Sequence, residues 1–226
     1  MKKTALLIIC ALMLLTLCAC NNQNDNTSDS DNISASFDQV SLYSDCEIIG
    51  TWICEDINEE CYFIFEENGD AYAKWGTSTV YGYFDYYEEE NVYDIDVPNF
   101  LYNEYEAKLS GDHMTLTSDE TSYDFEKATI PEITIKAPDN LAVDKKILGN
   151  WQSADSYECY RFNKDSTAVI TDLYNYATID CKYSCDKGVV TFYYMSGNTK
   201  DGTREAEYSL KGGKLTLAGY TYENVD

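Results

Sequence analysis

An internal repeat covers the chain from residue 46 to residue 226. Three segments recur in the same order and at nearly the same spacing: 48–52 as 147–151, 61–65 as 159–162, and 107–116 as 208–217. A repeat of this kind restricts the possible folds, because each copy must form the same structural unit. We therefore predict two homologous domains, 46–127 and 147–226. A linker over 128–146 joins them and holds two of the three prolines.

The pattern inside each repeat predicts antiparallel β-strands. The chain has 21 tyrosines and no sustained apolar period of 3.6 residues, and its short alternating runs end at Gly, Asn and Asp. Asn68-Gly69 predicts a hairpin with a type I′ turn, and Gly212-Gly213 predicts another. Seven or eight strands in about eighty residues favour a meander that closes and leaves no free edge. The predicted fold class is all-β, with two tandem small antiparallel up-and-down β-barrels.

The N-terminus is typical of an exported protein. Lys2 and Lys3 precede an apolar run over 5–19, which is too short to span a membrane and has the order of a signal peptide. The run ends in Leu17-Cys18-Ala19-Cys20, which resembles the lipobox of bacterial lipoproteins. The resemblance implies a signal peptide over 1–19, cleavage between Ala19 and Cys20, and diacylglycerol on Cys20. An ordinary secretory signal with an incidental cysteine is the alternative.

Residues 20–45 are predicted to be the acylated cysteine and a flexible tether. The segment is rich in Asn, Asp and Ser and has little apolar content to bury. Two acyl chains are enough for stable anchoring. We therefore expect the protein on the extracytoplasmic face of the bacterial cell membrane, held by its lipid.

The start and the end of each repeat carry a resemblance to a known family. A Gly-x-Trp opening, Gly50 and Trp52 in the first repeat and Gly149 and Trp151 in the second, is followed by hairpins and a closing Leu-x-Gly-x-x-Leu/Met-Thr-Leu pattern. This combination resembles the small lipocalin-like domains of envelope lipoproteins from Gram-positive-type bacteria. The resemblance implies that these four residues are structural, with the tryptophans packed across the barrel base. Each repeat is about half a lipocalin in length, so we expect the interior to be filled by its own side chains.

Six of the nine cysteines lie beyond the signal peptide and Cys20, and an extracytoplasmic location permits disulfides. A hairpin centred between residues 57 and 58 places Cys54 opposite Cys61, which makes this pair the best disulfide candidate. Cys181 and Cys185 are about 13 Å apart on one strand, beyond the roughly 7 Å that a disulfide spans.

The other cysteines leave several alternatives open. Cys159 could pair with Cys181 or Cys185, and Cys46 has no obvious mate. A zinc site from Cys159, Cys181 and Cys185 is conceivable, but no C-x-x-C pair or histidine ligand supports it. Reduced, buried cysteines are another possibility. We expect no metal and no cofactor.

Charge and motif content limit the function. The formal charge of −24 argues against nucleic acid and favours a basic partner or simple colloidal stability. The chain has one histidine, His113, and lacks a G-x-S-x-G elbow and a phosphate-binding glycine loop. The acidic run 88–90 is more typical of a solvated loop than of glycosidase acids. We assign no catalytic residue and expect no enzyme.

One tyrosine-rich segment suggests a binding surface. Tyr81, Tyr83 and Tyr87 share one face of a predicted strand, while Phe84 and Tyr86 share the other. Exposed tyrosines could stack on sugar rings or meet a protein partner, although tyrosine also fits half-buried strands. Asp94 and Asp96 likewise share a face and could hold a cation, or could simply be exposed.

We predict a membrane-anchored, non-catalytic binding module. Its partners are the membrane, through the lipid, and a basic protein, small molecule or glycan. An inhibitor of a basic wall-degrading enzyme such as lysozyme is the first alternative, and a hydrolase of envelope glycans is the second.

Overall fold

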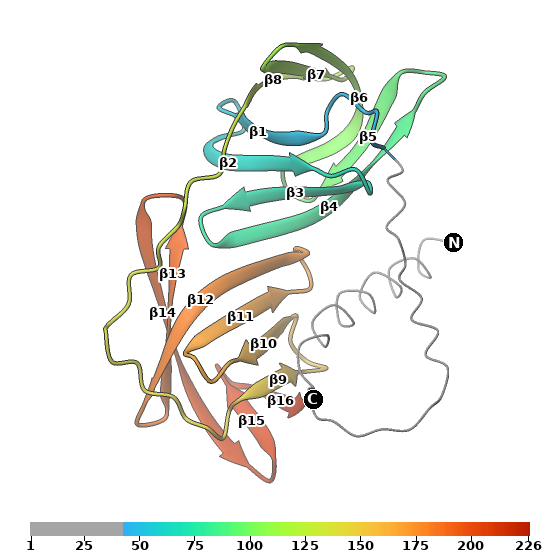
Figure 1. Ribbon diagram of the computed structural model, residues 1–226. Helices are drawn as coiled ribbons and strands as arrows, with labels where there is room; N and C mark the ends of the chain where they lie inside the picture. The colour runs from blue at the N-terminus through green and yellow to red at the C-terminus, as the bar shows by residue number, and fades with distance from the viewer. Residues whose placement is uncertain (1–42) are drawn as a thin grey trace, which may run out of the picture. The chain divides into compact units, whose positions relative to one another are not determined.

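The computed structural model describes residues 43–226, which form antiparallel strands and no helix (Figure 1). The all-β prediction is confirmed. Within this range no helix is long and apolar enough to cross a membrane. The predicted signal peptide over 1–19, the Ala19–Cys20 cleavage and lipidation site, and the tether as far as residue 42 lie outside the described residues.

Sixteen strands are found between residues 43 and 226. The first eight are β1 (Gly50–Cys54), β2 (Asn58–Phe65), β3 (Asp70–Trp75), β4 (Ser78–Tyr87), β5 (Val92–Val97), β6 (Leu101–Ser110), β7 (His113–Thr117) and β8 (Ser122–Lys127). The others are β9 (Gly149–Gln152), β10 (Glu158–Phe162), β11 (Thr167–Asp172), β12 (Ala177–Asp186), β13 (Val189–Ser196), β14 (Lys200–Lys211), β15 (Lys214–Leu217) and β16 (Tyr220–Asn224).

Strands β1–β8 form a closed eight-stranded barrel, here called the N-terminal barrel. Each strand pairs with the next along the chain, and β1 returns to β8 through Trp52 opposite Lys127 and Ile53 opposite Glu126. Closure leaves the strand edges paired, as expected for an up-and-down meander. The inward residues of the last hairpin include Met114 and Phe125, which are buried as their alternation predicts.

Strands β9–β16, here called the C-terminal strands, follow the same order of pairing. β9 returns to β16 through Trp151 opposite Asn224, and β11 pairs with β12. A short antiparallel contact between β4 and β12, with Val80 opposite Ala177, joins all sixteen strands into one hydrogen-bonded sheet. The core residues fall into two clusters, one from each set of strands.

The register agrees between the two sets of strands. Trp52 lies opposite Phe63 in β2, and Trp151 lies opposite Tyr160 in β10. Since residues 63 and 160 are equivalent, Cys61 corresponds to Glu158. The match of Cys61 with Cys159 suggested by sequence similarity is therefore wrong by one residue. The segment from Trp52 to its partner Phe63 is longer than the segment from Trp151 to its partner Tyr160. An alignment by similarity alone therefore shifted the second strand of one repeat against that of the other.

Both predicted hairpins are present, but one predicted turn type is wrong. Gly212 and Gly213 both have positive φ, and Lys211 pairs with Lys214, as a two-residue type I′ turn requires. At Asn68-Gly69 only the glycine has positive φ, and the Glu66 amide donates to the Asp70 carbonyl. This connection is a three-residue loop ending in a glycine bulge. The Asn68 side chain favours it by accepting a hydrogen bond from the Asp70 amide, 3.0 Å long.

The two Gly-x-Trp tryptophans have the same local structure. Trp52 is 1% exposed and its indole N–H donates to the Ile48 carbonyl at 2.8 Å. Trp151 is also buried and donates to the Ile147 carbonyl at 2.7 Å. The glycines that precede them have positive φ, 138° at Gly50 and 110° at Gly149, which favours glycine over other residues. Each tryptophan thus ties the chain entering the first strand to the core.

A polar cluster lies inside the C-terminal strands. The Arg204 guanidinium on β14 makes two 2.7 Å contacts with the Glu158 carboxylate on β10, and Tyr160 donates to the same carboxylate. β10 and β14 are not neighbours in the sheet, because β9, β16 and β15 separate them. The ion pair therefore links two separated strands. The hydrogen bonds from Arg204 hold the pKa of Glu158 below its usual range.

The lowered pKa of Glu158 gives a pH-dependent prediction. The ion pair should stabilise the fold fully above the unfolded pKa of a glutamate, about 4.3, and this contribution should disappear as the pH falls through the lower folded value. We expect Glu158→Gln to reduce the free energy of unfolding at pH 7 by about 1–2 kcal/mol, measured by urea unfolding. Glu205→Gln, at an exposed position of β14, is the control. A Glu158→Gln loss that persists undiminished in acid would contradict this account.

Candidate functional site

Three carboxylates lie side by side on the outer surface of β4, β5 and β6. Asp85 is opposite Asp94, and Asp94 is opposite Glu104, so the three form one row across three strands. Neighbouring strands are about 4.8 Å apart, so the row extends over roughly 10 Å. Like charges placed directly opposite each other destabilise a sheet. The fold therefore bears a cost here, which a cationic partner would remove.

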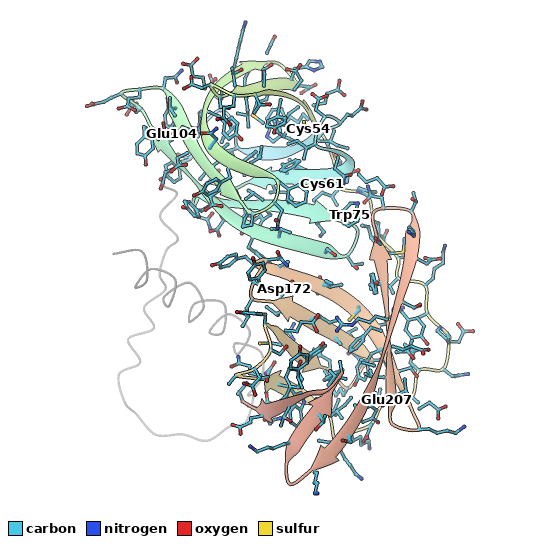
Figure 2. The ribbon with its side chains drawn as sticks, turned by 180° about the vertical axis from the view of Figure 1, so that it is seen from behind. Cys54, Cys61, Trp75, Glu104, Asp172 and Glu207 are labelled. Carbon is cyan, nitrogen blue, oxygen red and sulfur yellow. The ribbon has the colours of Figure 1, made fainter. Side chains whose placement is uncertain are left out.

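Tyrosines flank this row on both sides. On one side Asp96 lies between Tyr83 and Tyr102, and on the other Tyr87 lies opposite Val92. Tyr102 is 77% exposed, and Tyr83 and Tyr87 are also exposed. We call this surface the tyrosine–carboxylate face; its members are Tyr83, Asp85, Tyr87, Asp94, Asp96, Tyr102 and Glu104. Figure 2 marks Glu104.

The opposite side of the same strands anchors the face to the core. Phe84 and Tyr93 are buried, and Tyr86 stacks on Tyr93 with ring centroids 4.5 Å apart. The predicted division of β4 into two faces, with Tyr83 and Tyr87 on one and Phe84 and Tyr86 on the other, is therefore confirmed, and the structure shows that Phe84 and Tyr86 are on the core side.

Tyr81 is on the same side of β4 but does not belong to this face. Its ring packs edge-on against Tyr72, and its hydroxyl lies 3.2 Å from the Thr178 hydroxyl. The contact between β4 and β12 covers this end of the strand. The grouping of Tyr81 with Tyr83 and Tyr87 as potential ligand contacts is thus corrected.

The tyrosine–carboxylate face combines negatively charged carboxylates with neutral tyrosine hydroxyls. Burial and the carboxylates of Asp96, Asp94 and Asp85 raise the pKa of Tyr83. Burial and the carboxylates of Asp94, Asp85 and Glu104 raise the pKa of Tyr87. Burial also raises the pKa of Asp96, against a hydrogen bond from Tyr83 that lowers it. The tyrosines therefore remain hydrogen-bond donors at neutral pH, beside carboxylates.

No Lys, Arg or His among residues 43–226 forms an ion pair with a carboxylate of this face. Asp85 accepts a 2.8 Å hydrogen bond from the Tyr43 hydroxyl, which raises the pKa of Tyr43 to about 12. Over the same range, no three His, Cys, Asp or Glu side chains are grouped closely enough to hold a metal ion. The charge is thus spread along the row, which suits a partner with several separated cationic groups.

The C-terminal strands show that the fold does not require this surface. Phe84 and Tyr183 are equivalent, since their amides donate to the carbonyls of Gly69 and Ser166 in matching loops, each at 2.8 Å. The row equivalent to Asp85, Asp94 and Glu104 is therefore Ser184, Thr191 and Glu205. The carboxylate row is a feature of the first repeat alone.

Sequence reasoning found part of this site. It singled out Tyr83, Tyr87, Asp94 and Asp96, and the structure brings these four together. It missed Asp85, Tyr102 and Glu104, because their place beside β5 depends on the pairing of three strands. The only signal in the sequence was alternation within each strand.

The other residues considered for chemistry lie apart from this face. Cys54 and Cys61 are buried in the core of the N-terminal barrel, and no disulfide joins them in the structure. Cys181 and Cys185 are both buried on β12. His113 begins β7 and is highly exposed, with its Nδ1 3.9 Å from the Glu126 carboxylate. The acidic run 88–90 forms the turn between β4 and β5.

A groove of about 650 Å³ lies outside the C-terminal strands, between linker residues 137–142 and the side chains of Asp165 and Lys182. It has no exposed aromatic side chain. The tyrosine–carboxylate face is therefore the better candidate site. Comparison of the chain with protein-family models, with curated proteins and with solved structures finds no match.

Proposed function

We propose that the protein is a lipid-anchored extracytoplasmic binding module that holds a cationic protein on its tyrosine–carboxylate face. The observation that carries the proposal is the row of Asp85, Asp94 and Glu104, which has no counter-charge among the described residues and lies between exposed tyrosines. The module has no catalytic role in this proposal and needs no cofactor. The lipobox at Cys20 supports the location.

The proposed scaffold is a pair of tandem lipocalin-like barrels. The matching order of pairing in β1–β8 and β9–β16, and the equivalent registers of Trp52 and Trp151, support two copies of one unit. In this arrangement the first copy carries the binding face, while the second copy has a different outer surface on the same strands.

The chemistry of the face favours a polypeptide with Lys and Arg side chains. Tyrosine offers apolar area, a hydroxyl and a ring that attracts cations, at a small entropic cost. Opposite charges steer the encounter and select the partner more than they add affinity. A basic protein satisfies both requirements, because it brings several cations and an apolar surface together.

A basic wall-degrading enzyme is the partner class that we favour next. The charge of the face suits such an enzyme, and an inhibitor would act by covering its cationic surface. A glycan hydrolase is the weaker alternative, since the carboxylates of Asp85, Asp94 and Glu104 stand on an open strand surface.

The charge row can be tested with hen lysozyme as the cationic probe. We expect the triple variant Asp85→Asn, Asp94→Asn, Glu104→Gln to bind at least about tenfold more weakly at low salt, a change of about 1.4 kcal/mol. The control is Glu205→Gln with Glu207→Gln, which removes charge from exposed positions of β14. Equal binding by the wild type and the triple variant, measured by biolayer interferometry, would refute the proposed face.

The tyrosines provide a separate prediction. Tyr102→Ala should change the free energy of unfolding by less than about 0.5 kcal/mol, because the side chain is exposed, yet weaken binding of the same probe. Tyr174→Ala is the matched control, since Tyr174 is 71% exposed and lies beyond the face. Equal effects of the two substitutions on binding would show that Tyr102 takes no part in it.

A further inference from the structure

The two repeats differ at one position of their second strand. In the C-terminal strands the position holds Glu158, which the Arg204 guanidinium reaches from β14. In the N-terminal barrel the equivalent residue is Cys61, and the counterpart of Arg204 is Asn103, which is exposed. The ion pair of the second repeat therefore has no equivalent in the first.

A second cysteine lies beside Cys61 in the same core. Trp52 is opposite Phe63 and Ile53 is opposite Tyr62, so Cys54 directly follows this last regular pair on β1 and Cys61 directly precedes it on β2. Both side chains are 0% exposed and belong to one cluster (Figure 2).

The strand pairing becomes irregular at this point. A bulge follows Ile53 and Cys54 pairs with Asn58, so the predicted placement of Cys54 directly opposite Cys61 is wrong. Burial and the neighbouring Cys54 raise the pKa of Cys61 to about 12. Burial likewise raises the pKa of Cys54. Because both side chains are fully buried, external oxidants do not reach their sulfurs in the closed barrel, so oxidation has to precede closure.

We propose that Cys54 and Cys61 are joined by a disulfide before the N-terminal barrel closes, and that this bond ties β1 to β2 in the repeat that lacks the Glu158–Arg204 ion pair. One Sγ–Sγ bond forms and two S–H bonds break. The two electrons and the two protons pass to the disulfide of an extracytoplasmic thiol–disulfide oxidoreductase, which becomes a dithiol. The other cysteines of the described range take no part in the bond.

The test is a peptide map of the full chain, isolated from the membrane fraction and alkylated in denaturant after an acid quench. A protease that cuts after glutamate cleaves at Glu55, Glu59 and Glu60, between the two cysteines. We expect their peptides to remain linked until a reductant is added, and Cys181 to be alkylated without reduction. Alkylation of both Cys54 and Cys61 without reduction would overturn the proposal.

A second experiment tests the bond independently of the compartment in which the protein is found. The reduced, unfolded chain is refolded in a buffer of reduced and oxidised glutathione, whose disulfide accepts the electrons. We expect the same linked peptides and a Tm that falls when a reductant is present during refolding. In the variant Cys54→Ser, Cys61→Ser the reductant should leave the Tm unchanged, while Cys181→Ser should behave as the wild type. Refolded protein without the linked peptides would exclude the pair whatever the compartment of the native chain.

Discussion

Replacing Gly82 with alanine should unfold the N-terminal barrel or lower its free energy of unfolding by about 3 kcal/mol or more. A methyl group at this position would lie 2.0 Å from the Asp96 carbonyl oxygen and 2.8 Å from the Val97 Cα. Both are backbone atoms of β5, so no side chain can turn aside to make room. Relief requires β5 to move away from β4, and that movement breaks the pairing that closes the barrel.

Gly111→Ala is the matched control for this prediction. Gly111 has a φ of 64° and no atom within 4 Å of the added methyl group, so only the backbone preference opposes alanine there. That preference costs about 1 kcal/mol. Urea unfolding followed by circular dichroism measures both variants. Losses of equal size would show that the close approach of β5 to Gly82 has little energetic weight.

The Gly82 variant also bears on binding. Gly82 directly precedes Tyr83, and the contacts of Asp96 with Tyr83 and Tyr102 depend on the position of β5. A shift of β5 should therefore disturb the tyrosine–carboxylate face together with the core. We expect any Gly82→Ala protein that still folds to bind lysozyme more weakly than Gly111→Ala.

Local sequence patterns predicted the features of this fold that depend on neighbouring residues. Alternation placed Phe84 and Tyr83 on opposite faces of one strand, and the paired glycines 212 and 213 predicted the correct turn. Each of these features depends on a few consecutive residues. The all-β class follows from the same patterns, repeated along the chain.

The errors arose where pairing between strands decides the result. Cys61 was matched with Cys159 because the residues around them are similar, but the register makes Glu158 the equivalent residue. A one-residue slip reverses which side chains face the core. The row formed by Asp85 and Glu104 with Asp94 was missed for the same reason. Nothing in the sequence of one strand indicates which residue of the next strand lies opposite.

The two repeats therefore share contacts of their cores and differ on the outer surface of their strands. The indole N–H of Trp52 and of Trp151 donates to the same kind of backbone carbonyl. In contrast, the position of Asp85 in the first repeat is held by Ser184 in the second. Such a difference is expected when one copy of a scaffold acquires a binding surface.

Trp52→Ala is the second change for which we expect a large effect. Trp52 is almost fully buried, so truncation leaves a cavity and removes the hydrogen bond to the Ile48 carbonyl. Substitutions of this kind cost about 3–5 kcal/mol. A domain has roughly 5–15 kcal/mol of stability in all. The N-terminal barrel should therefore unfold at a clearly lower temperature than in the wild type.

The control is Trp75→Ala, because Trp75 is 37% exposed and its substitution should lower the free energy of unfolding by less.

Trp151→Ala then provides a comparison with the equivalent site of the second repeat. If the two sets of strands unfold independently, the calorimetric scan should show two transitions, and Trp52→Ala and Trp151→Ala should each lower the midpoint temperature of a different one. Hydrogen exchange of β1–β8 and β9–β16 shows which set of strands each substitution destabilises. A single transition whose midpoint temperature falls equally in both variants would mean that the sixteen strands unfold as one cooperative structure. The pairing of β4 with β12 would then couple the two sets.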